Sequence, residues 1–265
     1  MAALHGLRGS ARDWFRLAPP LRRELQRSGT SASALRLLTL PGHRPAAGPP
    51  ERVDRWTFLA LHREVERQLD RIADLRCVVG HSWGARFALE YAAERPERSL
   101  VVVLIAPYFE RSQLGGPGLW ASSHPRGAAA LQWALGRLRL PSLPLVRSAL
   151  FEEYEAYAHE GRPAREFLAE DQERASPGVF MAFADTPDFA PRARLQACGR
   201  SPAGPRFLLF WSLDDRVLAP CSYPVLEGSL RASGVLLGSI VSRAGGHNPQ
   251  IHRPEEVARG IARHL

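Results

Sequence analysis

A serine flanked by glycines is the residue of this sequence best placed to do chemistry. Ser82 is the centre of Gly80-His81-Ser82-Trp83-Gly84, which follows the apolar run from Leu75 to Val79 and precedes a segment of helical character. Glycine at both flanks lets a strand turn sharply into a helix, and such a turn exposes the central hydroxyl at the helix N-terminus. We interpret Ser82 as a nucleophile. The weaker alternative is a serine in an ordinary glycine-rich turn.

A serine hydroxyl is a weak nucleophile at neutral pH, so it needs a base within reach and an acid to orient that base. His247 follows a pair of glycines in a tight loop, directly after the strand expected over residues 235–241, and is the candidate base. The adjacent residues Asp214 and Asp215 follow another apolar run and are the candidate acids. At this point both aspartates remain open.

Five motifs together resemble the α/β-hydrolase family over nearly the whole chain. They are Leu4-His5-Gly6-Leu7, Leu40-Pro41-Gly42-His43, Gly80-His81-Ser82-Trp83-Gly84-Ala85, Trp211-Ser212-Leu213-Asp214-Asp215-Arg216-Val217 and Gly245-Gly246-His247-Asn248-Pro249. The order serine, acid, histidine along the chain is also that of the family. The resemblance implies an α/β fold, in which a mostly parallel central sheet is flanked by helices and carries an inserted helical cap. It does not indicate a substrate, because the family includes esterases, thioesterases, lipases, peptidases and lyases.

The resemblance also implies roles for single residues. Family members often carry a glycine three residues before the acid and Arg-Val just after it; with Ser212 in the place of that glycine, this register selects Asp215, and Asp214 is the fallback. The backbone N–H groups of Leu7 and Trp83 correspond to the oxyanion hole, the two donors that stabilise the negative charge of a tetrahedral intermediate. The resemblance implies no metal and no organic cofactor.

Arg86, one helical turn after Ser82, allows a second interpretation. The menaquinone-pathway synthases, which eliminate pyruvate and close a ring, are similar here: they carry an arginine at this place and a His-Asn pair like His247-Asn248, although Gln250 stands where they repeat a histidine. In such a lyase Arg86 would bind a substrate carboxylate. We favour the simpler interpretation, in which Arg86 is a solvated or salt-bridged helix residue.

Hydrophobic patterning places these motifs on an α/β framework. Continuous apolar runs such as residues 100–105 are typical of parallel strands buried on both faces. Apolar residues recur at helical spacing from Phe58 to Ile72, which predicts an amphipathic helix that covers the sheet. We expect a hydrolase core over residues 1–107 and 191–265, a helical cap over residues 108–190, and a mainly apolar pocket beneath that cap.

Composition limits the class of protein. A chain of 265 residues with 45% hydrophobic content can bury one sizeable core. The net charge is +8, but every basic residue is arginine and these are scattered among 27 acids, which favours a solvated surface over nucleic-acid binding. Three separated cysteines (Cys77, Cys198 and Cys221) favour a reducing cytoplasm, and neither a membrane span nor a signal peptide is recognisable. Because the chain begins almost at His5, either the sheet is minimal or the true start lies upstream of Met1.

The sequence therefore predicts a serine hydrolase that cleaves an ester or related acyl bond of a small, largely apolar molecule. Ser82, His247 and Asp215 would form the catalytic triad. Dehalogenases and epoxide hydrolases are disfavoured because they use aspartate where this chain has serine. A lyase that uses the same serine and histidine to remove a proton is the alternative. A non-catalytic relative that binds a ligand is less favoured, because all three triad residue types are present. The oligomeric state stays open.

Overall fold

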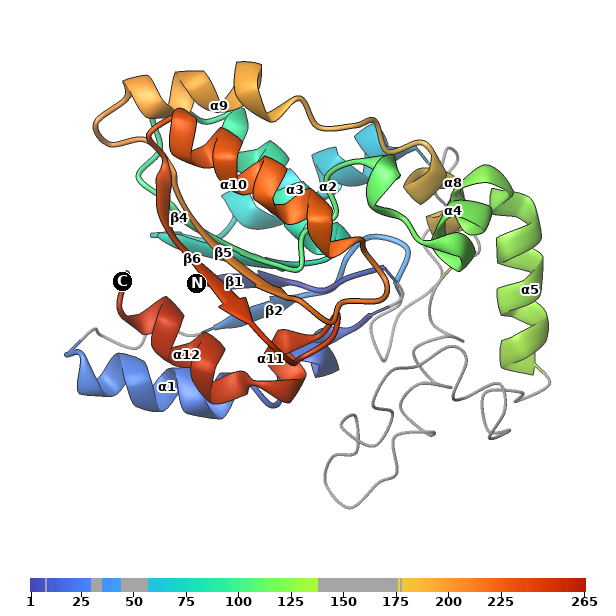
Figure 1. Ribbon diagram of the computed structural model, residues 1–265, viewed down its shortest axis with the longest axis horizontal. Coiled ribbons are helices and arrows are strands. Elements are labelled where there is room, and N and C mark those ends of the chain that lie inside the picture. The colour runs from blue at the N-terminus through green and yellow to red at the C-terminus, as the bar shows by residue number, and fades with distance from the viewer. Residues whose placement is uncertain (8, 30–34, 44–56, 138–175, 177) are drawn as a thin grey trace.

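Six parallel strands form one central sheet in the computed structural model of the protein (Figure 1). In spatial order they are β2 (Arg36–Leu38), β1 (Ala2–Leu4), β3 (Cys77–His81), β4 (Val101–Ile105), β5 (Arg206–Ser212) and β6 (Leu236–Ser242). Every pair of neighbouring strands is parallel. The structure describes residues 1–7, 9–29, 35–43, 57–137, 176 and 178–265. The predicted, mostly parallel sheet is confirmed.

Continuous apolar runs form the central strands because both faces of the sheet are covered. All five residues of β3 are buried, and so are four of the five residues of β4. Successive side chains of a strand point to opposite faces, so a strand covered on both faces must be apolar at every position. The carboxyl ends of β1, β3, β5 and β6 lead into the loops that carry the predicted site residues.

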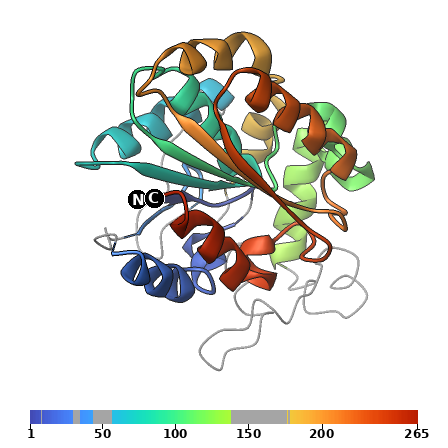
Figure 2. The same ribbon diagram turned by 60° about the vertical axis from the view of Figure 1, so that its left-hand side comes forward.

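Helices cover the two faces of the sheet in separate layers (Figures 1 and 2). One layer contains α2 (Phe58–Asp70), α3 (Trp83–Ala93), α9 (Pro191–Arg200) and α10 (Tyr223–Ala232), and the other contains α1 (Ala18–Arg27) and α12 (Pro254–Ala262). The periodic apolar positions Phe58, Leu61, Val65 and Leu69 of α2 are all buried. The predicted amphipathic helix that covers the sheet is therefore present.

The segment between β4 and β5 contributes helices outside the two layers. These are α4 (Gly116–Ser123), α5 (Pro125–Arg137) and α8 (Gly178–Ala184), seen on the right of Figure 1. The N–H of Phe189 donates to the carbonyl of Phe109 at 2.8 Å, so the two ends of this insertion lie side by side. The bounds of the cap remain a prediction. Much of its expected apolar pocket involves residues 138–175, which lie outside the described residues.

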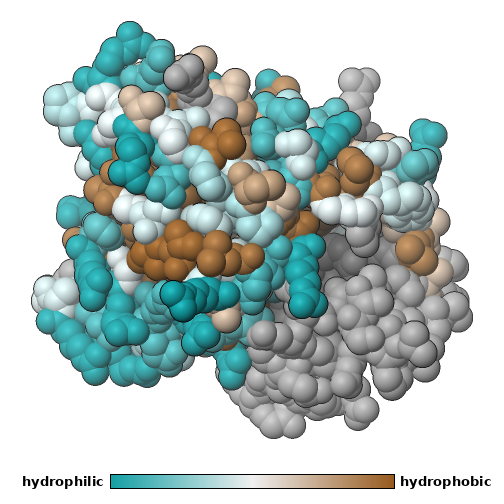
Figure 3. Space-filling view, in the orientation of Figure 1, coloured by the Kyte–Doolittle hydropathy of each residue, from teal (hydrophilic) through white to brown (hydrophobic). Residues whose placement is uncertain are grey.

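The molecular surface is hydrophilic over α1 and α12, at the lower left of Figure 3. Apolar side chains gather nearer the middle of that view. Leu237 and Val241 of the edge strand β6 are exposed apolar residues. Among the helices that the structure describes, none is both long enough and apolar enough to cross a membrane.

Candidate active site

Ser82 occupies the turn between β3 and α3 in a backbone conformation that non-glycine residues rarely adopt. Its φ is 52° and its ψ is −119°. A residue held in such a region costs about 1–3 kcal/mol, so the surroundings must enforce it. Two backbone hydrogen bonds do so: the Ser82 N–H donates to the carbonyl of Ile105 at 2.9 Å, and the Ser82 carbonyl accepts from the N–H of Tyr108 at 3.1 Å.

The two glycines that flank Ser82 allow three backbone segments to meet at this turn. A Cβ on Gly80 would lie 2.5 Å from the Cα of Ala85, and a Cβ on Gly84 would overlap the carbonyl oxygens of Leu4 and His5 at the end of β1. Neither overlap can be relieved by rotating a side chain, because the atoms in the way belong to the backbone. The predicted reason for Gly-x-Ser-x-Gly is thus visible in the packing.

His247 lies in the loop between β6 and the short helix α11 (Pro249–His252). Gly245 and Gly246, which precede it, have φ values of 144° and 55°. Asp214 fastens this loop, since its carboxylate accepts from the N–H of Gly246 at 2.9 Å and of Gly245 at 3.3 Å. The backbone of this loop is therefore held at the end of β5 by the Asp214 side chain, while the His247 ring bonds a different residue.

That partner is Asp215. Its Oδ2 lies 2.9 Å from His247 Nδ1, and its Oδ1 accepts from the N–H groups of Val217 and Leu218 at 2.9 and 3.0 Å. Burial alone would raise the pKa of Asp215, but the charge of the His247 ring and the hydrogen bonds to the carboxylate together lower it below its ordinary value. Asp215 is therefore a buried carboxylate that stays ionised at neutral pH.

Ser82 and His247 are brought to the same end of the sheet through His81. The Nε2–H of His81 donates to the His247 carbonyl at 2.8 Å, and the two imidazole rings lie 5.0 Å apart. Within the described residues, no hydrogen bond joins Ser82 Oγ to the His247 ring. Catalytic hydrogen bonds of this kind are often long in enzymes without substrate and tighten when substrate binds.

The loop after β1 lies against Ser82. If Gly6 carried a Cβ, that atom would lie 3.2 Å from the Cβ of Ser82. The backbone of Gly6 therefore packs closely against Ser82. His5 fixes this loop: its Nε2 accepts from the Leu40 N–H at 3.0 Å, so Nδ1 carries the proton and donates to the Gly6 carbonyl at 2.9 Å. Burial lowers the pKa of His5 well below its ordinary value, which keeps the ring neutral.

The two predicted oxyanion donors flank this contact. Trp83 is the first residue of α3, where backbone N–H groups have no partner within the helix. Leu7 follows Gly6 in the loop beside Ser82. In the part of the chain that the structure describes, neither N–H donates to another backbone carbonyl.

Arg86 is a buried, salt-bridged residue of α3. Only 1% of it is exposed, and all three guanidinium nitrogens are bound within the protein. Nε and Nη2 donate to Glu90 Oε1 at 3.0 and 2.6 Å, and Nη1 donates to the Phe109 carbonyl at 3.0 Å. The guanidinium also lies 5.2 Å from the ring centroids of Phe58 and Phe189. Its salt-bridged state agrees with the favoured interpretation. Three of its five N–H groups are engaged in these hydrogen bonds, and the side chain is enclosed by the protein.

One other cluster of titratable residues lies at the far end of α3. His62, Glu66 and Glu94 place potential metal-ligating atoms within 4.8 Å of one another. Arginines already neutralise both carboxylates, because Arg95 bonds Glu66 at 2.8 Å and Arg194 bonds Glu94 at 3.3 Å. Two guanidinium groups at these acids oppose a divalent cation, so we interpret the cluster as an ion-pair network between α2, α3 and α9.

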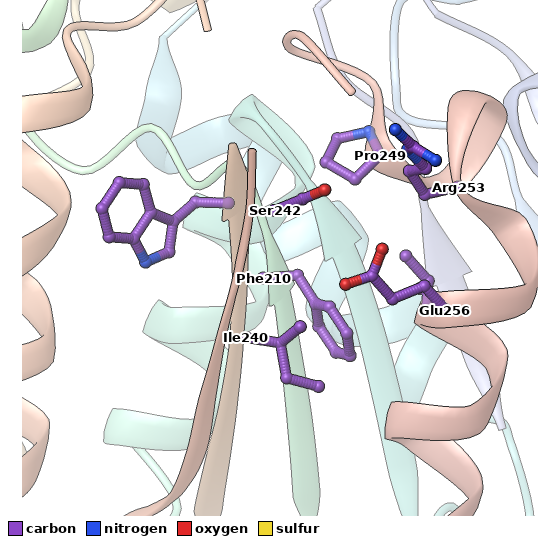
Figure 4. Close-up of a pocket in the computed structure, with 8 residues that line it drawn as sticks. Phe210, Ile240, Ser242, Pro249, Arg253 and Glu256 are labelled. Carbon is purple, nitrogen blue, oxygen red and sulfur yellow. The ribbon is translucent and has the colours of Figure 1, made fainter. Parts of the chain in front are cut away.

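A small pocket lies on the opposite face of the sheet from α3. Phe210 and Ile240 of the sheet line it together with Pro249, Arg253 and Glu256, and it opens between β6 and α12 (Figure 4). The predicted site residues do not line it. Because its walls are mostly apolar and it is narrow, it is interpreted as a packing gap beside α12.

Three residues near the predicted triad have contacts that the sequence did not indicate. Asp214 holds the loop of His247, His81 bonds the carbonyl of the same residue, and the Tyr223 hydroxyl donates to Asp215 Oδ2 at 2.6 Å. His81 lies within the recognised motif, and that position alone could have drawn attention to it. Tyr223 follows Asp215 by eight residues at the start of a helix, and no sequence pattern singles it out.

Comparisons with known sequences and structures show which proteins the chain is similar to. A family model described as the alpha/beta hydrolase family matches residues 3–260. By sequence, no curated protein is significantly similar to the chain. A membrane phospholipase A described as a bacterial virulence factor is similar in structure, with a TM-score of 0.67 and 22% identity over 98% of this chain and 76% of that chain.

Two further solved structures show the same likeness. A thermophilic esterase from Thermogutta terrifontis has a TM-score of 0.65 and 18% identity, covering 100% of this chain and 88% of its own. An epoxide hydrolase from metagenomes of hot environments has a TM-score of 0.61 and 20% identity, covering 98% of this chain and 88% of its own. At these identities the likeness concerns the fold, and the names include two different reactions.

Proposed function

The chain belongs to the alpha/beta hydrolase family, and from this premise we propose that it is a serine hydrolase that cleaves an ester or related acyl bond of a small, largely apolar molecule. The observation that carries the proposal is the hydrogen bond between Asp215 Oδ2 and His247 Nδ1, formed on a loop that His81 ties to the turn of Ser82. A carboxylate on Nδ1 leaves Nε2 as the basic nitrogen, which is the tautomer that general-base catalysis requires.

The reaction would proceed in two acyl-transfer steps. His247 Nε2 accepts the proton of Ser82 Oγ as that oxygen forms a bond to the acyl carbon, and the N–H groups of Leu7 and Trp83 bind the oxyanion. The bond to the leaving alcohol then breaks, and His247 donates its proton to that oxygen. A water molecule, deprotonated by the same ring, cleaves the acyl-enzyme and restores the Ser82 hydroxyl. Asp215 stays ionised throughout and stabilises the imidazolium.

Labelling with a fluorophosphonate tests the nucleophile. The reagent should modify Ser82 in the folded protein, and Ser82→Ala should remove both labelling and turnover of a panel of acyl esters of graded chain length. Ser229→Ala, on α10, is the matched control and should be labelled like the natural protein. Labelling that persists in Ser82→Ala would contradict the assignment.

Replacing the base tests the triad as a unit. His247→Ala should lower kcat by at least about a thousandfold. The base and the nucleophile act together, so removing the base loses most of the rate enhancement that the triad provides. The measurement is ester hydrolysis at saturating substrate, with circular dichroism to show that the variant is folded. An unchanged kcat would refute the triad.

The lyase interpretation depended on Arg86 as a ligand for a substrate carboxylate. In the structure this guanidinium is enclosed by Glu90, Phe109 and two aromatic rings, so no described contact favours that activity. A polycarboxylate should be assayed beside the ester panel, since release of pyruvate from it, with no hydrolysis of any ester, would overturn the hydrolase proposal in favour of the lyase.

A further inference from the structure

Tyr223 lies directly behind the proposed acid of the triad. It is the first residue of α10, it is completely buried, and its ring packs 5.2 Å from that of Trp211 at the end of β5. From this position its hydroxyl donates to Asp215 Oδ2 at 2.6 Å. A hydrogen bond from a neutral hydroxyl to a buried carboxylate is among the stronger kinds in proteins.

The oxygen that accepts from Tyr223 is the same one that faces the His247 ring. Asp215 Oδ1 is occupied by two backbone N–H groups, while Oδ2 is shared between Tyr223 and His247 Nδ1. Burial, together with the negative charge of Asp215, raises the pKa of Tyr223 well above its ordinary value. The hydroxyl therefore keeps its proton and remains a donor at every pH at which the enzyme would be assayed.

We propose that Tyr223 is a positioning residue of the proposed triad, which shares the negative charge of Asp215 Oδ2 and so limits how strongly that carboxylate attracts a proton to His247. This inference rests on the proposed function. The physical reason is that a second donor disperses the charge of the acceptor oxygen, so less of it is available to stabilise an imidazolium. The same hydrogen bond fixes Oδ2 in the plane where His247 Nδ1 meets it.

Other charged and titratable groups around His247 can be separated from this effect. The neighbouring ring of His81 is neutral, because burial lowers its pKa to about 3. The Asp214 carboxylate is bound to the N–H groups of Gly245 and Gly246, and Arg253 donates to the carbonyl of Ala244 at 3.3 Å, so both of these face the loop backbone. Tyr223→Phe leaves His81, Asp214 and Arg253 unchanged and removes only the tyrosine hydroxyl from Asp215 Oδ2.

The test follows the His247 ring by NMR across a pH titration and, separately, the pH profile of kcat/KM. In Tyr223→Phe the NMR titration midpoint and the acid limb of the profile should both move to higher pH, by about half to one pH unit. At the plateau, kcat should fall by less than about tenfold, because the triad itself is intact. Circular dichroism and a thermal melt establish that the variant is folded.

Tyr91→Phe is the matched control. It also removes a tyrosine hydroxyl that donates to an aspartate, Asp70 Oδ1 at 2.7 Å, but at the far end of α3. It should lower stability without moving either midpoint. In an Asp215→Asn background, Tyr223→Phe should no longer move the NMR midpoint, since the shared charge is gone.

Several outcomes would overturn the proposal. A folded Tyr223→Phe variant whose His247 midpoint stays in place, or moves to lower pH, contradicts it. If the variant does not fold, a fluorinated tyrosine placed at position 223 provides the test, because its hydroxyl is a stronger donor and should move the midpoint to lower pH. The NMR readout does not need turnover. The two proposals can therefore fail separately. If Tyr223→Phe moves the NMR midpoint but His247→Ala remains active, the proposed function is refuted and the role of Tyr223 at Asp215 is retained.

Discussion

The carboxylate of Asp214 accepts a hydrogen bond from the N–H of Gly246 at 2.9 Å, one residue before His247, whose ring bonds to the neighbouring carboxylate of Asp215. Two consecutive aspartates thus do different work at one loop. The first holds the backbone in place, and the second holds the imidazole. Both aspartates therefore contact the loop of His247, and the residues alone did not show which of them bonds the ring. Only the alignment with the family motif selected Asp215.

Substituting each aspartate by asparagine should separate these two tasks. Asp215→Asn should lower kcat by about ten-thousandfold, because an amide at this position favours the wrong imidazole tautomer. Asp214→Asn should cost less than about tenfold, since an amide oxygen can still accept from the Gly246 N–H. Steady-state kinetics on a common ester measure both. The reverse ranking would make Asp214 the acid.

A methyl group at Gly84 should prevent the turn of Ser82 from forming. A Cβ there overlaps the carbonyl oxygens of Leu4 and His5, so we expect Gly84→Ala to lower the free energy of unfolding by about 3 kcal/mol or more. Gly228→Ala is the control: this glycine lies within α10 with nothing near its Cβ position, and alanine should stabilise the helix by roughly 0.5–1 kcal/mol. Equal effects of the two changes, measured by urea unfolding, would disprove the steric explanation.

Loss of Arg86 should be a stability defect. Arg86→Ala removes two hydrogen bonds to a Glu90 side chain that is itself buried, and breaking a buried pair costs about 3–5 kcal/mol, reduced here because Arg194 also contacts Glu90. Arg27→Ala offers a contrast, since Arg27 pairs with Glu24 at 2.7 Å on the surface of α1 and should cost less than about 1 kcal/mol. Urea unfolding compares them. A stable Arg86→Ala protein with more than thirtyfold lower kcat/KM would contradict the structural role.

Acid should destabilise the protein through histidines that are buried without charge. Burial, with a smaller contribution from the His247 ring, lowers the pKa of His81 from 6.5 to about 3. The unfolded chain therefore binds a proton at this residue below pH 6.5 that the folded chain does not bind. The contribution of neutral His81 to the free energy of unfolding is therefore fully present above pH 6.5. It falls by roughly 1.4 kcal/mol per pH unit as the pH drops towards 3.

His81→Gln should reduce this loss, because the glutamine amide can donate to the His247 carbonyl and does not titrate. Between pH 6.5 and pH 5 the variant should lose about 2 kcal/mol less stability than the natural protein. His124→Gln, at an exposed histidine, should follow the natural curve. Parallel curves for the natural protein and His81→Gln would show that His81 is not buried in its neutral form.

The sheet and its main helices could be predicted because their signals are local. The run of Leu100 to Ile105 is apolar at every position, as a strand covered on both faces requires, and the structure places β4 there. The turn at Ser82 could also be predicted from the sequence, because glycine tolerates a close approach of two backbones and few other residues do. The order of the motifs along the chain supplied the rest of the family assignment.

The burial of Arg86 could not be read from the sequence in the same way. Helical periodicity gives α3 one apolar face, but residues Trp83 through Ala92 are all buried, because the sheet and α2 and α9 surround the helix. The partners of Arg86 include Phe58 and Phe189, which are 28 residues before it and 103 residues after it in the chain. Contacts between such distant segments appear only when the chain is folded, and the hydroxyl of Tyr223 on Asp215 is of the same kind.

The hydrogen bond between the Phe189 N–H and the Phe109 carbonyl has a consequence for how this protein can be altered. The chain enters the insertion after β4 and leaves it before α9 at these two neighbouring residues. The insertion is also tied to the core by the Ala219 N–H on the Gln113 carbonyl at 2.8 Å and by the Trp83 indole N–H on Thr186 Oγ1 at 3.1 Å. A replacement segment joined at Phe109 and Phe189 would therefore have to provide these two contacts again.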